Sequence, residues 1–321
     1  MEYCKIGVSN KQVSKLCLGC MTFGDNQTQF HDWTLPYEES KEIIKHALDL
    51  GINFFDTANV YSKGTSEEYL GRALKELDVN REDVFIATKV YFNDGKLSKE
   101  AINREIELSL KRLQTDYIDL YIIHRFDKTT PIEETMNALN DLVQSGKVKN
   151  IGASAMYGYQ FHNMQEIADK NGWAKFVTMQ NHYNMLYRED ERELIPVCNQ
   201  YKTLLTPYSP LASGRLARAE WHTNTKRSQT DNTAAHKYDG FEEADKKIVG
   251  RVLELAKKYN CTMTQIALSY LFEKGVTAPI IGASKIKYLD DACGAFHVHL
   301  TIEDIAYLEE LYIPHSIVGA L

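Results

Sequence analysis

The sequence lacks the long apolar run that a membrane-spanning helix needs, since none of its 321 residues belongs to a stretch approaching about 18 apolar residues. Its first residues also lack the basic and then apolar pattern of a secretory signal peptide. The net charge at pH 7 is −7, which does not favour binding to nucleic acid or to an anionic membrane. We therefore expect a cytoplasmic protein that has neither a membrane nor a nucleic acid as its partner.

Cysteine is scarce, with six residues spread along the chain. Cys17 and Cys20 have the two-residue spacing of a redox or metal-binding pair, but no second pair exists to complete a zinc site. We interpret both as small strand residues with reduced thiols. A redox pair and a metal site are the alternatives, and no metal is expected.

The common glycine-rich motifs for phosphate binding are also missing. No G-x-G-x-x-G follows a predicted strand, and no G-x-x-x-x-G-K-[ST] occurs. Their absence argues against a doubly wound open sheet, which stays the alternative fold. No linker rich in proline, glycine and serine divides the sequence, so we expect one domain over residues 1–321.

What the sequence does contain is a regular alternation of short apolar runs and longer amphipathic segments. Strands are predicted at 16–19, 52–56, 84–89, 118–124, 150–154, 176–181, 203–208 and 277–281. Helices are predicted at 37–50, 66–75, 98–113, 131–145, 160–171, 189–201, 244–259, 264–273, 288–296 and 302–311. Eight strands, each followed by helical sequence, indicate the fold class α/β and a closed (β/α)8 TIM barrel.

Two further segments belong to neither the eight strands nor the predicted helices. Residues 3–7 and 13–15 are expected to form a small hairpin at the bottom of the barrel. The polar stretch 221–240, WHTNTKRSQTDNTAAHKYDG, follows the seventh strand and is expected to be a long loop. Such a loop is either a functional lid or an inert excursion.

The predicted strands end, one after another, on side chains that titrate or form hydrogen bonds. These residues are Asp56, Lys89, His124, Ser154, Gln180 with Asn181, Tyr208, and Gly282 to Ser284 after the eighth strand. Active sites of (β/α)8 barrels lie at the carboxyl ends of the strands. A polar ring is therefore expected at one mouth of the barrel.

This ring, with Tyr61 five residues after Asp56, predicts a proton-transfer site. The ammonium of Lys89, held by Asp56, is expected to lower the pKa of the Tyr61 phenol. Tyr61 could then protonate a carbonyl oxygen while His124 orients that oxygen. No serine or cysteine nucleophile is paired with a base, so a nicotinamide or flavin hydride donor fits best.

Two other functions stay open at this point. Lys89 could form a Schiff base in an aldolase- or isomerase-type barrel, which requires that it be free of Asp56. The chain could also be a cofactor-binding regulatory subunit that turns over slowly. Taken singly, a strand-end lysine, an interior histidine and a capping aspartate are each common without catalysis.

With these residues in view, the sequence resembles the aldo-keto reductase superfamily over nearly its whole length. GINFFDTANVYSKGTSEEYLGRAL resembles the family signature that carries the catalytic aspartate and tyrosine, at Asp56 and Tyr61. VFIATKV and DYIDLYIIHRFD are similar to the segments with the catalytic lysine and histidine, at Lys89 and His124. The resemblance implies an NAD(P)H-dependent oxidoreductase that reduces aldehydes or ketones, with NADP(H) more probable than NAD(H) as cofactor and a small-molecule carbonyl compound as substrate.

The resemblance also implies a set of cofactor-binding residues. For the carboxamide and the nicotinamide ring they are Ser154 in IGASAM, Gln180 in TMQNHYN, and Tyr208. For the pyrophosphate they are Ser209, Leu211, Gly214 and Arg215. For the adenosine phosphate they are Gly282, Ser284, Lys285 and Asp291 in IIGASKIKYLDDA. The sequence departs from the family pattern at Ala155, where one contact to the carboxamide is lost or replaced. It departs again at Tyr288 and Ala292, and these two changes weaken, without removing, the case for NADPH over NADH.

The sequence predicts the residues of the substrate pocket less clearly than those of the cofactor site. Aromatic side chains in the loops after the strands, namely Phe23, Phe30, Trp33, Tyr91 and Phe126, would suit an apolar or aryl aldehyde. The sequence indicates neither an oligomeric state nor a role for the C-terminal YIPHSIVGAL.

Overall fold

The protein is described by a computed structural model that covers residues 1–8, 10–28, 30–224 and 226–318. Its main sheet has eight parallel strands in the order β10-β3-β4-β5-β6-β7-β8-β9. These strands are Cys17–Gly19 (β3), Phe54–Asp56 (β4), Phe85–Val90 (β5), Ile118–Ile123 (β6), Val148–Ser154 (β7), Phe176–Gln180 (β8), Leu204–Leu205 (β9) and Ile280–Gly282 (β10). The edges are joined because Ala278 N donates to Leu205 O and Ile280 N to Pro207 O. The sheet closes into a barrel, which confirms the predicted (β/α)8 fold.

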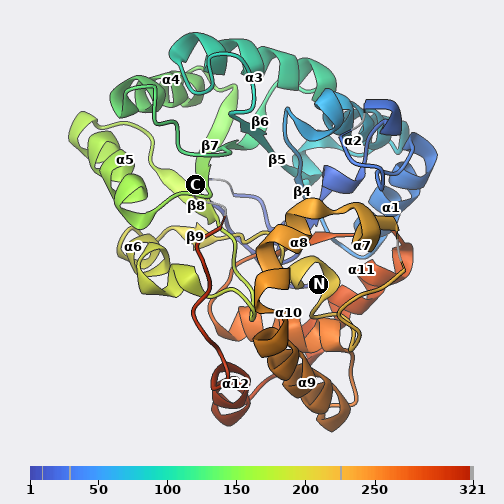
Figure 1. Ribbon diagram of the computed structural model, residues 1–321. Helices are drawn as coiled ribbons and strands as arrows, with labels where there is room; N and C mark the ends of the chain where they lie inside the picture. The colour runs from blue at the N-terminus through green and yellow to red at the C-terminus, as the bar shows by residue number, and fades with distance from the viewer. Residues whose placement is uncertain (9, 29, 225, 319–321) are drawn as a thin grey trace.

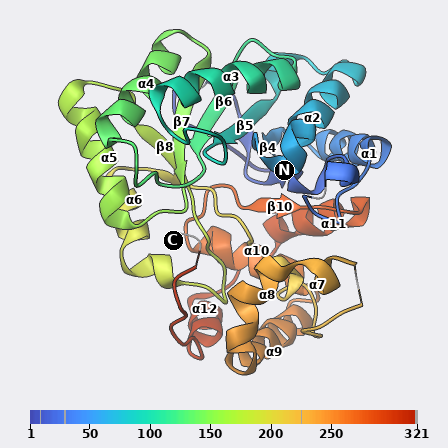
Figure 2. The ribbon, with the colours of Figure 1, turned by 45° about the horizontal axis from the view of Figure 1, so that its top comes forward.

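Helices surround the barrel, as Figures 1 and 2 show. They are Tyr37–Asp49 (α1), Thr65–Glu76 (α2), Lys99–Leu113 (α3), Ile132–Gln144 (α4), Gly158–Asn171 (α5), Leu194–Gln200 (α6), Glu242–Lys258 (α9), Met263–Glu273 (α10), Ile286–Cys293 (α11) and Ile302–Glu309 (α12). The α3 helix shows why they form: Ser98 caps its first turn, and Ile102, Ile106 and Leu113 lie buried along one face.

The alternation of side chains along each strand decides which ones reach the barrel interior. In β6, Leu120 and Ile122 belong to the cluster inside the barrel, whereas Tyr121 and Ile123 pack between the strands and the helices. Side chains two residues apart share a face. His124 therefore continues the interior row of Ile122 at the carboxyl end of the barrel. The same rule places Lys89 after Ala87, and Asp56 after Phe54.

Three segments differ from their prediction. The seventh strand is limited to β9, shorter than the expected 203–208. The helix expected at 189–201 is divided into the 3-10 turn Glu189–Arg192 and α6. Pro196 lacks an N–H, so it fits the first turn of a new helix better than the interior of a long one.

The segment expected as a long loop at 221–240 holds two short helices, Lys226–Thr230 (α7) and Asn232–Tyr238 (α8). The carboxylate of Asp231 caps α8 by accepting from Ala234 N at 2.9 Å. Thr225, inside this segment, lies outside the described residues. The expected hairpin is present as Tyr3–Cys4 (β1) and Val13–Ser14 (β2).

The C-terminal segment returns from α12 towards the barrel mouth. His315 is buried against Asp245, with its Nε2 3.1 Å from Oδ1, and its ring stacks on Phe241 at 4.0 Å between centroids. Further on, Val318 N donates to Tyr187 OH at 3.1 Å, beside the end of β8. The last three residues of the tail, 319–321, lie outside the described residues.

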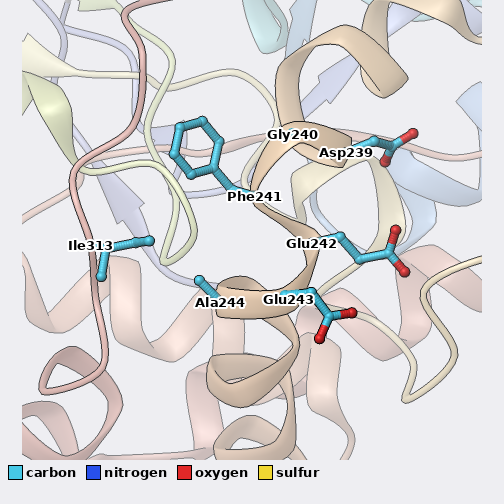
Figure 3. Close-up of a pocket in the computed structure, with 7 residues that line it drawn as sticks. All are labelled: Asp239, Gly240, Phe241, Glu242, Glu243, Ala244 and Ile313. Atoms are coloured by element: carbon cyan, nitrogen blue, oxygen red, sulfur yellow. The ribbon is translucent and has the colours of Figure 1, made fainter.

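A pocket opens where this segment passes the start of α9, and Figure 3 shows its lining. Residues 239–244 form one side and Ile313 the other. In that view, the carboxyl groups of Asp239, Glu242 and Glu243 point away from Ile313. None of the predicted site residues lines this pocket.

Among the described residues, no helix is both long enough and apolar enough to span a membrane. Within the same residues, no group of three or more His, Cys, Asp or Glu side chains is placed to hold a metal ion.

Candidate active site

Four of the predicted residues converge at the carboxyl end of the barrel. Lys89 Nζ donates to Asp56 Oδ1 at 2.5 Å, to Thr57 O at 2.8 Å and to Tyr61 OH at 3.2 Å. The rings of Tyr61 and His124 lie edge to face, with centroids 5.8 Å apart. The structure therefore brings Asp56, Tyr61, Lys89 and His124 together, as the strand ends predicted.

Local backbone bonds explain how Tyr61, which is outside any strand, reaches Lys89. Thr57 N donates to Ala87 O and Asn59 N to Lys89 O, so the segment after β4 continues along β5. Tyr61 then opens a 3-10 turn in which Ser62 and Lys63 have left-handed φ values of 47° and 55°. Non-glycine residues in this region are uncommon and gather at functional sites.

The charge of Lys89 follows from its surroundings. Burial lowers the pKa of the Lys89 amine, but Asp56 and Tyr61 outweigh burial, and the pKa lies above its usual value. Lys89 is fully buried, and its three hydrogens all have acceptors. It is thus a fixed ammonium, not the free amine that a Schiff base requires.

The expected lowering of the Tyr61 pKa is wrong in direction. Burial raises the pKa of the Tyr61 phenol, and the opposing charge of Lys89 offsets only part of this effect. At neutral pH the hydroxyl therefore holds its proton, which suits a donor. Lys89 favours the phenolate that remains after the proton has left.

His124 is neutral near physiological pH. Burial, followed by the charges of Lys89 and Arg125, holds its pKa well below the usual range. Its Nδ1 is buried without a hydrogen-bond partner among the described residues. A neutral imidazole carries one N–H, which can donate to a carbonyl oxygen without adding positive charge.

Ser154 and Gln180 lie side by side at the ends of β7 and β8. Ser154 Oγ donates to Gln180 O at 2.8 Å, and Gln180 Nε2 donates to Asp56 Oδ2 at 2.8 Å. Both side chains are buried. The side-chain oxygen of Gln180 and the hydroxyl oxygen of Ser154 can still accept hydrogen bonds. Such acceptors match the N–H groups of a carboxamide.

Tyr208 is the outermost ring of an aromatic column. It lies parallel to His182 at 5.2 Å, and His182 lies parallel to Tyr187 at 4.1 Å between centroids. His182 is fixed in turn, because its Nε2 is 2.7 Å from the hydroxyl of Tyr238 on α8. His182 was not predicted, since a single histidine beyond a strand end carries no signal of its own.

The segment after Tyr208 combines unusual backbone with buried cations. Ser209, Ser213 and Gly214 have φ values of 55°, 55° and 94°. The Nε atoms of Arg215 and Arg218 are buried without a partner among the described residues. Orphaned guanidinium donors beside such a loop fit an anionic group such as a pyrophosphate. Leu211 is half-buried and packs against the core.

The remaining predicted cofactor residues lie around the start of α11. Gly282, Ser284 and Lys285 are exposed there. Asp291 is already used within the protein, because its Oδ1 accepts from Thr262 Oγ1 at 2.6 Å. This bond links α11 to α10, which gives Asp291 a structural role that the sequence did not predict.

The aromatic residues predicted for the substrate pocket separate into two groups. Phe23 is fully buried in the main hydrophobic core, so its expected place in an open pocket is wrong. Tyr91, Phe126 and Trp33 lie in loops around the mouth, and Trp33 stacks on His31 at 4.4 Å between ring centroids. Phe30 lies 6.1 Å from the ring of Tyr61.

Phe92 was not predicted, yet its half-exposed ring lies 5.0 Å from the ring of His124. Its position in the loop after β5 gave no pattern that distinguishes it from Tyr91.

Comparison with known proteins agrees with this geometry. Residues 15–313 match the model of the aldo/keto reductase family. The chain belongs to the aldo/keto reductase family. This aldo/keto reductase is 42% identical to versiconal hemiacetal acetate reductase of Aspergillus parasiticus, over 99% of this chain and 98% of that protein. It is 42% identical to an aldo-keto reductase of Fusarium vanettenii, over 99% and 93% of the two chains.

A third relative carries an aryl-alcohol dehydrogenase name and comes from Schizosaccharomyces pombe. It is 43% identical, over 98% of this chain and 97% of its own. Membership of the family makes this protein a nicotinamide-dependent oxidoreductase that reduces carbonyl groups. No comparison supports the Schiff-base alternative, which the fixed ammonium of Lys89 also opposes.

Proposed function

We propose that Tyr61 protonates the oxygen of an aldehyde or ketone while His124 holds that oxygen through its N–H. Lys89 stabilises the phenolate that Tyr61 becomes, and Asp56 keeps Lys89 charged and in place. The observation that carries this assignment is the simultaneous contact of Lys89 Nζ with Asp56 and Tyr61. When bound, the nicotinamide cofactor supplies the hydride for the carbonyl carbon.

We assign the cofactor contacts as follows. Tyr208 offers its ring to the nicotinamide, and Ser154 with Gln180 binds the carboxamide. Ser209, Leu211, Gly214 and Arg215 line the pyrophosphate. The parallel column behind Tyr208 and the orphaned Arg215 Nε support these assignments.

NADP(H) is the preferred cofactor in this proposal. Its 2′-phosphate needs cationic and hydroxyl donors that solvent or ligand can reach. Ser284 and Lys285 are exposed together where α11 begins, and Gly282 precedes them without a side chain. NADH has no phosphate at this position, so it would leave Lys285 without a ligand.

The proposed substrate is an apolar or aryl carbonyl compound. Trp33, Tyr91, Phe92 and Phe126 support it by their places around the mouth. The chain acts as one catalytic domain in this proposal, in the cytoplasm, where its six free cysteines would stay reduced.

Titration of intrinsic fluorescence with NADPH and with NADH tests the cofactor assignment. We expect tighter binding of NADPH, and Lys285→Ala should reduce the difference between the two cofactors. Lys247→Ala, on the exposed side of α9, is the matched control. Turnover of an aromatic aldehyde, followed at the nicotinamide absorbance, tests the reaction. Binding of neither cofactor would contradict the proposal.

A further inference from the structure

Two cations stand beside the catalytic groups without a carboxylate partner. Arg125 follows His124 directly and donates from Nη1 to His124 O at 2.7 Å, with its Cζ 5.6 Å from the Phe92 ring. Lys237, on α8, holds its Nζ 4.6 Å from the centre of the Tyr208 ring. Among the described residues, no carboxylate lies within 4.0 Å of either cation.

The nearest acidic groups already have other partners. Asp127, two residues after Arg125, accepts from Thr129 and Thr130. Asp231, which faces α8, accepts from Arg227 Nε at 3.1 Å and caps the helix through Ala234 N. Neither cation therefore has a carboxylate as a direct partner within the described residues, although the charge of Asp231 acts on Lys237 from beyond ion-pair distance.

The charge of Arg125 acts on Lys237 and on two tyrosines of the mouth. Burial lowers the pKa of Lys237 to about 8, and the charge of Arg125 contributes to this decrease. The charge of Arg125 also acts on the pKa of Tyr61 and of Tyr208. Two like charges that repel each other in a half-buried site are stabilised by a bound anion.

These cations are separate from Arg215, which is assigned to the cofactor. Arg215 pairs with Asp239 at 2.6 Å and packs near Trp221, in the loop that follows Tyr208. Arg125 and Lys237 instead flank His124 and Tyr208, where the carbonyl group reacts. The anion that they face is therefore on the substrate.

We propose that Arg125 and Lys237 bind a carboxylate on the substrate, so that the enzyme prefers carbonyl compounds that carry an anionic group beside an aromatic part. This inference rests on the proposed function, because it uses the same mouth and the same reaction. The hydride adds to the carbonyl carbon, the proton of Tyr61 goes to the carbonyl oxygen, and the carboxylate is unchanged. Phe92, which lies beside Arg125, would contact the aromatic part.

The test compares 4-carboxybenzaldehyde with its neutral methyl ester, methyl 4-formylbenzoate, at saturating cofactor. The two share a ring and a carbonyl group and differ in charge. We expect wild-type kcat/KM to be about tenfold higher for the acid, the size of one charge-assisted hydrogen bond. Arg125→Gln and Lys237→Gln should each lower the acid-to-ester ratio by about tenfold, and Lys247→Gln should not change it.

Two further measurements keep the outcome decisive if one variant folds poorly. The acid-to-ester ratio of the wild-type enzyme should fall as salt is added, because screening weakens the contact. Cofactor affinity, measured by fluorescence, should be the same in the Arg125→Gln and Lys247→Gln proteins. An acid-to-ester ratio of one or less in the wild-type enzyme would overturn the inference. An unchanged ratio in the variants, together with weaker cofactor binding, would also overturn it. Turnover of neither aldehyde would instead count against the proposed function.

Discussion

The ammonium of Lys89 lies 3.2 Å from the hydroxyl oxygen of Tyr61, inside a barrel mouth where Lys89 is fully buried. This contact joins β5 to the turn that follows β4, through residues that are 28 positions apart in the chain. It explains how a phenol with a raised pKa can still release its proton: the cation is already in place to stabilise the phenolate.

Replacement of Lys89 by methionine tests this role. The variant keeps the length of the side chain but loses the charge and the hydrogen bond to Tyr61. Because general acid catalysis contributes about 10²- to 10⁴-fold, we expect kcat to fall by about that factor. Steady-state kinetics with a neutral aromatic aldehyde measures it, and Lys247→Met on the surface is the control. Turnover of Lys89→Met within threefold of wild type would contradict the role.

The pH dependence of reduction follows from two pKa directions. Tyr61 must keep its proton, and its pKa lies above the ordinary 10. His124 must stay neutral, and its pKa lies below the ordinary 6.5. We expect kcat/KM for methyl 4-formylbenzoate to be flat between pH about 6.5 and about 10. A decline with a midpoint near pH 8 in both wild type and Lys237→Gln would show that the pKa of Tyr61 is lowered instead.

His182 is expected to act on the cofactor through Tyr208. Loss of its ring removes the parallel contact at 5.2 Å and the bond to Tyr238. Since an aromatic pair contributes about 0.5–1.5 kcal/mol, His182→Leu should raise the Kd for NADPH by about 2- to 10-fold. Turnover at saturating cofactor should change less than the Kd does. The exposed His297→Leu serves as control, and an equal Kd in both variants would remove His182 from this role.

Asp190 makes the stability of the fold depend on pH. Burial raises the pKa of its carboxyl to about 7, although Asn181 donates to it at 3.0 Å. In the unfolded chain the pKa of the Asp190 carboxyl is about 3.9. The folded state therefore binds more protons than the unfolded state between pH about 4 and about 7. Stability from this group is therefore present at low pH and decreases as pH rises through that window.

Asp190→Asn removes the buried charge and keeps an acceptor for Asn181. The variant should be more stable than wild type at pH 8, by at most about 4 kcal/mol for a pKa difference of about three. At pH 4 the two proteins should be nearly equal. Urea unfolding at both pH values measures this, with the exposed Asp116→Asn as control. Equal free energies of unfolding for the two proteins at pH 8 would show that ionisation of Asp190 does not destabilise the fold.

The convergence of the proposed catalytic groups could be predicted from the sequence because parallel strands bring their carboxyl ends to one edge. The apolar runs before Asp56, Lys89 and His124 were sufficient to place these side chains together. The position of Phe23 was predicted wrongly, because the sequence just after a strand does not show whether an aromatic side chain points to the core or to the mouth.

The direction of the Tyr61 pKa could not be predicted, because it depends on the balance of burial against one nearby charge. The position of Lys237 over Tyr208 depends on helix α8, which was not predicted because the sequence of 221–240 is polar. Contacts of this kind join elements that are distant in the chain and have no periodic signal.

The most direct test of the account is the turnover of Tyr61→Phe, measured together with its affinity for NADPH. Removing one oxygen leaves the ring beside His124 and takes away the proton. We expect reduction to fall by about 10²-fold or more while the Kd for NADPH stays within about twofold. Tyr3→Phe, in the hairpin at the other end of the barrel, should match wild type in both. Near-full turnover in Tyr61→Phe would contradict the assignment of Tyr61 as the proton donor.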